Sequence, residues 1–174
     1  SSSLDAGAAE RYVGQAAPFS SLGRRMSDPK YATANSILAA ARESQLSRTV
    51  FRQVAGFRAL EIIDRVLDTF TLQGRANRRS QWLWADLRDP KAFLSGPIQL
   101  SALHALGAPE TPVWLLVEDW ASTKRGTPTW VFESTLAAAI ATLQAHHLLE
   151  FYVISRSFEW LVGENHHDQI FAVG

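Results

Sequence analysis

Residues 113–118 read VWLLVE, and residues 129–132, after a polar loop over residues 122–128, read TWVF. Both runs consist mainly of β-branched, aromatic and leucine side chains, which pack well on the pleated surface of a sheet. The loop between them contains glycine and proline, the residues that most often interrupt regular structure. We therefore expect two strands joined as a hairpin, with the rest of the fold built around this pair.

The sequence after the hairpin predicts one helix and three further strands. Ser134 is a suitable N-cap for a helix whose apolar positions continue to residue 147. Such a helix packs across a sheet and lets the chain return to it. Strands are then expected at residues 150–155, 160–162 and 169–173.

The sequence before residue 73 predicts two amphipathic helices. Small and apolar residues recur at helical spacing over residues 31–46 and again over residues 47–70. Ser47 is the expected N-cap of the second helix, and Gly56 is expected to bend it.

Between these helices and the hairpin the character of the sequence changes. Residues 73–80 are polar and indicate an exposed loop. The hydrophobic period then becomes two over residues 81–87, so Trp82 and Trp84 are expected on one face of a strand. A short helix is expected at residues 100–106.

Together these elements predict an α+β fold in the order α-α-β-β-β-α-β-β-β. The expected sheet is mostly antiparallel, with about five or six strands and with helices mainly on one face. Residues 26–174 are expected to form this single domain. Residues 1–25 are rich in serine, alanine and glycine, so we expect a flexible leader that is vector-derived, an upstream linker, or an export or targeting tail.

The composition disfavours several classes of partner. Seventeen basic residues balance seventeen acidic ones, so no net field draws the chain to nucleic acid or to an anionic membrane. The chain has no cysteine and therefore no thiolate chemistry, and it has no apolar run that could span a bilayer. Glycine-rich phosphate loops and nucleophile elbows are absent. We expect a cytoplasmic protein without a cofactor, whose partner is another protein.

The densest cluster of polar residues lies at residues 160–168, which read WLVGENHHD between two expected strands. Gly163 and Asn165 tolerate left-handed backbone, so a tight turn is expected here. The turn would bring together the side chains that could bind a metal or form a His-Asp general base, which are Glu164, His166, His167 and Asp168.

A structural interpretation of the same cluster competes with the chemical one. No zinc-ligand spacing is present, and His166 and His167 would point to opposite faces of an extended strand. In that case the cluster is a turn whose side chains bond to backbone groups. Glu118 and Asp119 end the strongest strand and could supply carboxylates beside the histidines, although exposed strand ends are often acidic.

The six tryptophans all fall in or beside expected strands, and Trp160 begins the polar cluster. Most of them should belong to the core. If one face of the sheet were left uncovered, however, the remaining aromatic side chains would form an anchor surface for a partner protein.

The end of the chain, residues 150–174, resembles the C-terminal end of small bacterial proteins that finish in W-L-x-x-E-N-H-H-D. These proteins look like single-domain α+β immunity proteins, which neutralise the toxins of neighbouring bacteria by binding them. The resemblance covers about one seventh of the chain and implies binding rather than catalysis, with no role for individual residues.

Three hypotheses about function follow from the sequence. The first is a non-enzymatic protein-binding domain, such as an immunity protein, that uses an exposed sheet face and the turn at residues 164–168. The second is a small metal-assisted hydrolase built on acidic and histidine side chains, which are Glu118, Glu164, His166, His167 and Asp168. The third is an exported bacterial effector whose leader is a secretion signal.

Overall fold

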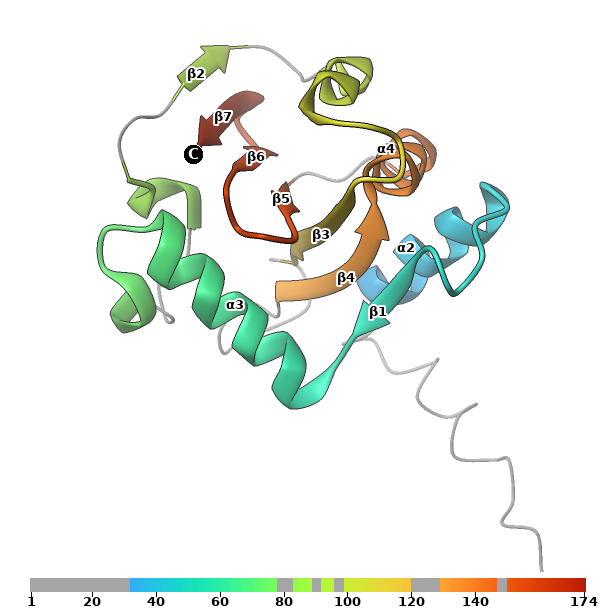
Figure 1. Ribbon diagram of the computed structural model, residues 1–174, viewed down its shortest axis with the longest axis horizontal. Helices are drawn as coiled ribbons and strands as arrows, with labels where there is room; N and C mark the ends of the chain where they lie inside the picture. The colour runs from blue at the N-terminus through green and yellow to red at the C-terminus, as the bar shows by residue number, and fades with distance from the viewer. Residues whose placement is uncertain (1–31, 78–82, 89–91, 96–98, 120–128, 147–149) are drawn as a thin grey trace, which may run out of the picture.

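The computed structural model describes residues 32–77, 83–88, 92–95, 99–119, 129–146 and 150–174. In these residues one sheet has seven strands in the order β1-β4-β3-β5-β6-β7-β2, and every neighbouring pair is antiparallel (Figure 1). The strands are β1 (Arg52–Val54), β2 (Ala92–Ser95), β3 (Pro112–Glu118), β4 (Thr129–Thr135), β5 (Phe151–Ser155), β6 (Leu161–Glu164) and β7 (Gln169–Val173). The predicted α+β class and antiparallel sheet are confirmed.

The hairpin of β3 and β4 lies at the centre of the fold, as its sequence predicts. Leu115 of β3 is opposite Phe132 of β4 on one side and Val153 of β5 on the other. Residues 113–117 are buried throughout, because β3 is covered on both of its faces. A strand of this kind reads as a continuous apolar run rather than an alternating one.

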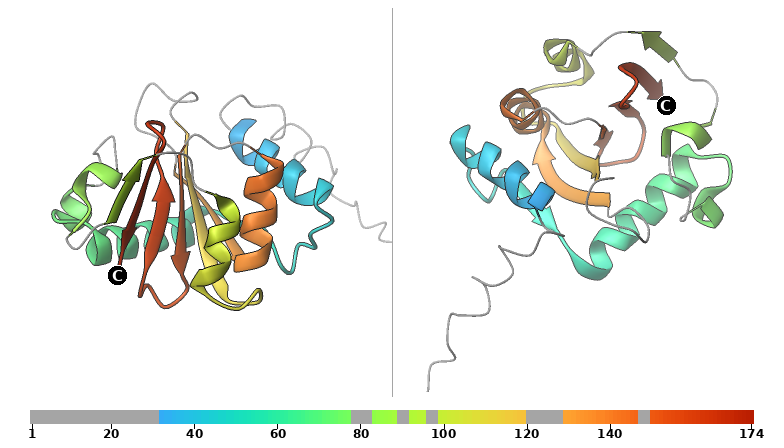
Figure 2. Two further views of the ribbon diagram at one scale, coloured as in Figure 1. Left: turned by 90° about the horizontal axis from the view of Figure 1, so that it is seen from above. Right: turned by 180° about the vertical axis from the view of Figure 1, so that it is seen from behind.

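Helices cover both faces of the sheet. One face packs against α2 (Ala32–Glu43), α4 (Leu136–Ala145) and the 3-10 helix η4 (Leu100–Leu106). The other face packs against α3 (Gly56–Phe70) and the 3-10 helix η3 (Leu83–Asp86), as the views of Figure 2 show. Two of the three α-helices in the described residues therefore share one face. Because the central strands β3, β4 and β5 are covered on both faces, they do not leave the uncovered sheet face that the sequence analysis considered.

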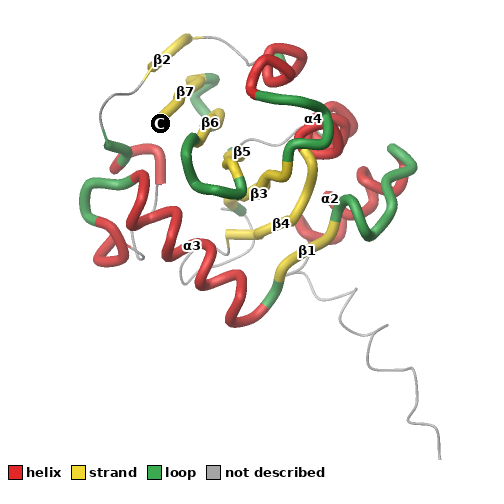
Figure 3. Tube along the Cα trace, viewed as in Figure 1, coloured by secondary structure: helices red, strands yellow, loops and turns green. Residues whose placement is uncertain are grey.

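The expected helix at residues 47–70 is wrong in its first part. Residues 52–54 form β1, which pairs with β4, and α3 begins only at Gly56 (Figure 3). Gly56 has φ 63°, a left-handed conformation that ends the strand and turns the chain into the helix. Phe51 and Val54 are also compatible with a helical spacing, so pairing with the edge of β4 decided the outcome.

The expected strand at residues 81–87 is also wrong. Residues 83–86 form η3, in which Leu83 is buried and Trp84 is half-buried, while Trp82 lies outside the described residues. Only Leu87 makes a β-bridge, to Thr71 at the end of α3. Apolar residues in this segment pack on one face of the sheet instead of forming another strand. The hydrophobic period of the sequence is compatible with both arrangements.

The remaining elements agree more closely with the sequence. The helix α2 lies within the expected range of residues 31–46, and residues 100–106 form a short helix. The cap of α4 is Thr135 rather than Ser134, because Thr135 Oγ1 accepts a hydrogen bond from the amide of Ala138 at 3.3 Å. Ser134 instead belongs to β4.

Two features concern the chain as a whole. None of the helices in the described ranges has the length and apolar character needed to cross a membrane. The expected leader at residues 1–25 lies outside the described residues.

Candidate functional site

Two glutamates meet in the interior at the end of the central strands. The amide of Glu118, the last residue of β3, donates to the carbonyl of Glu150, just before β5, at 3.2 Å. Side chains alternate along a strand, so Glu118 follows Trp114 and Leu116 on the face covered by α3. Glu150 shares that face with Tyr152, and only 1% of Glu150 is exposed.

The polar atoms of this carboxylate pair are bonded mainly to each other and to their neighbours. Tyr152 Oη donates to Glu150 Oε1 at 3.2 Å, and His166 Nδ1 lies 3.2 Å from Glu150 Oε2. Among the described residues Glu118 Oε2 is buried without a hydrogen-bond partner. The cluster therefore contains more acceptor oxygens than donors, unless one carboxyl group carries a proton.

Burial raises the pKa of the Glu118 carboxyl well above its usual range, and the negative charge of Glu150 raises it further. Burial also raises the pKa of Tyr152, with the two glutamates as the next causes. A protonated Glu118 can donate a hydrogen bond to Glu150. Glu118 therefore retains its proton to a higher pH than an ordinary carboxyl group.

The turn at residues 165–169 is built on Asn165. This buried side chain accepts hydrogen bonds from the amides of His167 at 3.0 Å and Gln169 at 3.1 Å, and its amide group donates to Gln169 Oε1 at 3.0 Å. The amide of Asp168 donates to the carbonyl of Asn165 at 3.1 Å, and Asp168 has φ 54°. This is a three-residue hairpin loop whose last residue is left-handed.

The structure corrects the expected roles of glycine and asparagine in this turn. Asp168, rather than Gly163 or Asn165, is the residue with left-handed backbone. Gly163 lies inside β6, where a Cβ atom would be 2.5 Å from the carbonyl oxygen of Phe151 and 2.7 Å from the ring of Phe171. Glycine is needed there for space, not for its backbone freedom.

The two histidines lie side by side because they belong to the turn and not to an extended strand. The ring centroids of His166 and His167 are 4.0 Å apart, and Trp84 of η3 meets both rings edge-on at 6.2 and 5.9 Å. About 30% of the His166 side chain is exposed. His166 thus connects the buried Glu150 with the protein surface.

Three other predicted site residues, Glu164, Asp119 and Trp160, lie at or beside the ends of β6 and β3. Glu164 ends β6 as a half-buried residue opposite Phe151 and Ile170. Asp119 is buried and accepts a bond from Trp130 Nε1 at 3.5 Å, while Trp160 is partly buried and packs on the core.

The structure thus joins Glu118 and His166 through Glu150 and Tyr152, two residues that the sequence analysis missed. A signal for Glu150 was available, because it is the one charged residue in the run LLEFYVI at residues 148–154. In the described residues no group of three or more histidine and acidic side chains has an arrangement that could hold a metal ion.

A second candidate surface lies on the outer side of α3. Phe57 is 76% exposed and Leu60 is 47% exposed, although the inner side of the same helix is buried in the core. Beside them is a groove of about 450 Å³. Its charged lining residues are Glu61, Asp64, Arg65, Asp68 and Arg75.

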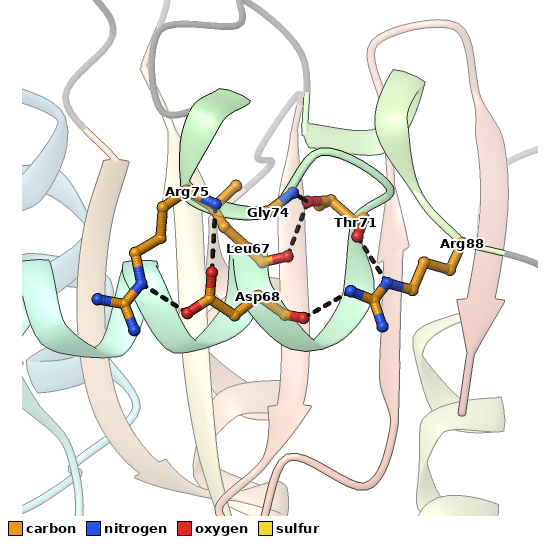
Figure 4. Close-up of polar contacts among 6 residues, drawn as sticks. All are labelled: Leu67, Asp68, Thr71, Gly74, Arg75 and Arg88. Carbon is orange, nitrogen blue, oxygen red and sulfur yellow. Dashed lines mark hydrogen bonds and ion pairs between the residues drawn. The ribbon is translucent and has the colours of Figure 1, made fainter.

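Hydrogen bonds hold one end of this groove rigidly (Figure 4). Asp68 accepts bonds from the amide of Arg75 at 3.2 Å and from its Nε at 2.5 Å. Arg88 donates to the carbonyls of Thr71 at 2.6 Å and Asp68 at 2.9 Å, which satisfies two carbonyls near the end of α3. Thr71 Oγ1 in turn accepts from the amide of Gly74 at 3.1 Å.

Comparison with known proteins places the chain in a family but not in a functional class. The model of a family of unknown function, DUF6756, matches residues 31–174, so the chain belongs to this family. Searches of curated proteins and of solved structures found no match.

Proposed function

We propose that this member of DUF6756 is a non-enzymatic protein-binding domain that docks its partner on the outer face of α3. The observation that carries the proposal is the exposure of Phe57, at 76%, beside a groove of about 450 Å³. An exposed aromatic ring next to a groove is the usual anchor of a protein interface.

The fold itself does not need Phe57 or Leu60. The inner side of α3 already supplies Ile62, Val66 and Phe70 to the core between the helix and the sheet. A second apolar patch on the outer side gains nothing in the monomer, because water surrounds it. It gains free energy only when another surface covers it.

The charged residues around the groove are also typical of an interface with a protein partner. Glu61 and Arg65 border the apolar pair with charges of opposite sign, as in interfaces with an apolar centre and a polar rim. The bonds of Arg75 and Arg88 at the end of α3 keep this wall in place before binding. A preorganised wall lowers the entropy cost of association.

The carboxylate pair favours binding over hydrolysis as the function. Glu150 and Tyr152 are 1% and 0% exposed, so a substrate would have to open the core to reach them. His166 contacts Glu150 but also belongs to a turn held by the buried Asn165. These contacts support a structural role for the cluster, in which it fixes the turn at residues 165–169 onto the sheet.

The resemblance of residues 150–174 to bacterial immunity proteins indicates which class of protein the partner belongs to. We propose a bacterial toxin, neutralised by occlusion when it docks on α3. This mode of action requires an exposed surface and no catalytic group, which agrees with the features of α3.

A photocrosslinking amino acid at position 57 tests the proposal. One partner protein should be captured from the native host at this position, and the same probe at Val50, an exposed apolar position outside α3, should not capture it. With the purified partner, Phe57→Ser should weaken binding at least tenfold, about 1.4 kcal/mol, whereas Leu72→Ser at another exposed leucine should not. Equal affinities of the two variants would contradict docking on α3.

The toxin class has its own test. Expression of the captured partner alone should arrest bacterial growth, and co-expression of the wild-type chain should restore it. Phe57→Ser should fail to restore growth. Normal growth with the partner alone would refute the immunity role but leave the binding surface on α3 supported.

A further inference from the structure

A second, smaller pocket lies between the end of α2, the loop that follows it and β1. Its volume is about 160 Å³. Its apolar wall consists of Leu38, Ala41, Leu46 and Phe51, of which Ala41 and Phe51 are almost completely buried. The wall is therefore part of the core and is fixed by the fold.

The charged lining of this pocket is entirely basic. It consists of Arg42, Arg48 and Arg52, with no acidic lining residue among those described. The side chains of Arg42 and Arg48 form no hydrogen bond or ion pair within the described part of the chain. In a chain with net charge zero, this is a local excess of positive charge.

The acidic partner of Arg52, Glu133, does not neutralise the pocket. Arg52 donates to Glu133 Oε2 through Nε at 2.8 Å and through Nη2 at 2.5 Å. Arg156 binds the other oxygen of the same carboxylate at 2.6 Å, so two guanidinium groups share one negative charge. The sum over Arg42, Arg48, Arg52, Arg156 and Glu133 is three positive charges, four minus one.

Helix electrostatics explain only part of this charge. Arg42 lies in the last turn of α2, where a cation stabilises the helix dipole. Arg48 lies beyond the helix, in the turn before β1, and gains nothing from the dipole. Its position on the same pocket as Arg42 and Arg52 requires another explanation.

We propose that this pocket binds a phosphate or carboxylate group carried on a small apolar body. Guanidinium groups pair with such oxyanions through two parallel hydrogen bonds, which fixes the anion at the rim. The wall of Leu38, Leu46 and Phe51 then receives the apolar part. The site is separate from α3 and does not depend on the proposed toxin-binding function.

The size of the pocket limits the ligand. A volume of about 160 Å³ accommodates one ring or a short aliphatic chain rather than a cofactor, since sites for drug-sized ligands start at roughly 300 Å³. Phenyl phosphate and benzoate are suitable probes because each combines one ring with one oxyanion. Inorganic phosphate and benzyl alcohol each carry only one of the two features.

Titration of the full chain with these four probes, followed by two-dimensional NMR, tests the proposal. Phenyl phosphate or benzoate should bind saturably, at least tenfold more tightly than inorganic phosphate, and shift the resonances of Ala41 and Gln53. Benzyl alcohol should not bind. Absence of saturable binding by both aromatic anions would overturn the proposal.

Charge variants make the test specific to the pocket. The double change Arg42→Gln, Arg48→Gln should weaken binding at least tenfold, and its unchanged NMR spectrum elsewhere would show that the fold is intact. Arg58→Gln and Arg65→Gln together remove the same charge from α3 and should leave the affinity unchanged. Equal loss in both double variants would indicate attraction to net charge only and would refute the site.

Discussion

The outer face of α3 and the carboxylate pair below the turn at residues 165–169 depart from the usual distribution of residues in opposite ways. On α3 an aromatic ring is exposed to water, whereas below the turn two carboxyl groups are buried in the core. The buried groups have partners within the chain, including Tyr152 and His166. The ring of Phe57, by contrast, is exposed to water. We therefore propose a structural role for the carboxylate pair and a binding role for Phe57.

A large loss of stability is expected at the turn. Asn165→Ala removes the acceptor of two backbone amides and the donor to Gln169, all near a buried position. We expect a loss of about 2 to 3 kcal/mol in the free energy of unfolding, measured by urea denaturation. His167→Ala, at an exposed position of the same turn, serves as the control and should lower the free energy of unfolding much less. A loss below about 0.5 kcal/mol for Asn165→Ala would show that the turn is not what holds His166 over Glu150.

A smaller change in stability is expected at the carboxylate pair. There Glu118→Gln should stabilise the protein at high pH, whereas Asn165→Ala destabilises it. Because the pKa of Glu118 is raised in the folded state, the folded protein keeps a proton that the unfolded chain loses. Stability therefore falls as the pH rises from the ordinary carboxyl pKa, 4.5, through the raised pKa of Glu118. Glu118→Gln imitates the protonated group and should remove this part of the pH dependence.

The measurement is the melting temperature of both proteins between pH 4 and pH 8, a range of about four units that begins below the ordinary carboxyl pKa. Glu118→Gln should be the more stable protein at the upper end and similar to the wild type at the lower end. Glu61→Gln removes a carboxylate from exposed α3 and controls for net charge. A Glu118→Gln variant that is less stable than the wild type at pH 8 would indicate that the charged carboxylate is a required group of the site.

The smallest effect on stability is expected on α3. Phe57→Ser removes a ring that is mostly in water, so the free energy of unfolding should change by less than about 0.5 kcal/mol. Phe70→Ser, at the buried end of the same helix, is the contrasting variant and should destabilise the fold strongly. Thermal denaturation of the two variants compares them directly. A large loss at Phe57 would mean that the ring packs on the domain, and the comparison between the two regions would then fail.

Local patterns in the sequence were sufficient for the second half of the fold. The expected strands at residues 150–155, 160–162 and 169–173 correspond to β5, β6 and β7, and the turn of Asn165 lies where the polar cluster predicted it. These elements are adjacent in the chain and pair with their neighbours, so period and turn residues determine them.

The first half and the candidate site depended on contacts between distant residues. Residues 52–54 form a strand because they pair with the edge of β4. Residues 83–86 form a 3-10 helix that packs on the sheet. The sequence singled out Glu118 and His166, but not Glu150 between them, since its importance arises from being buried beside both.

By itself, the sequence determined the α+β class, the central hairpin and the turn at residues 165–169, because each depends on interactions between residues close in the chain. Only the tertiary structure decided which face of α3 remains in water and which carboxyl groups are buried together. The physical reason is that burial and pKa depend on what packs against a residue in space, and Glu118 and His166, which meet Glu150 in the fold, are distant from it in sequence.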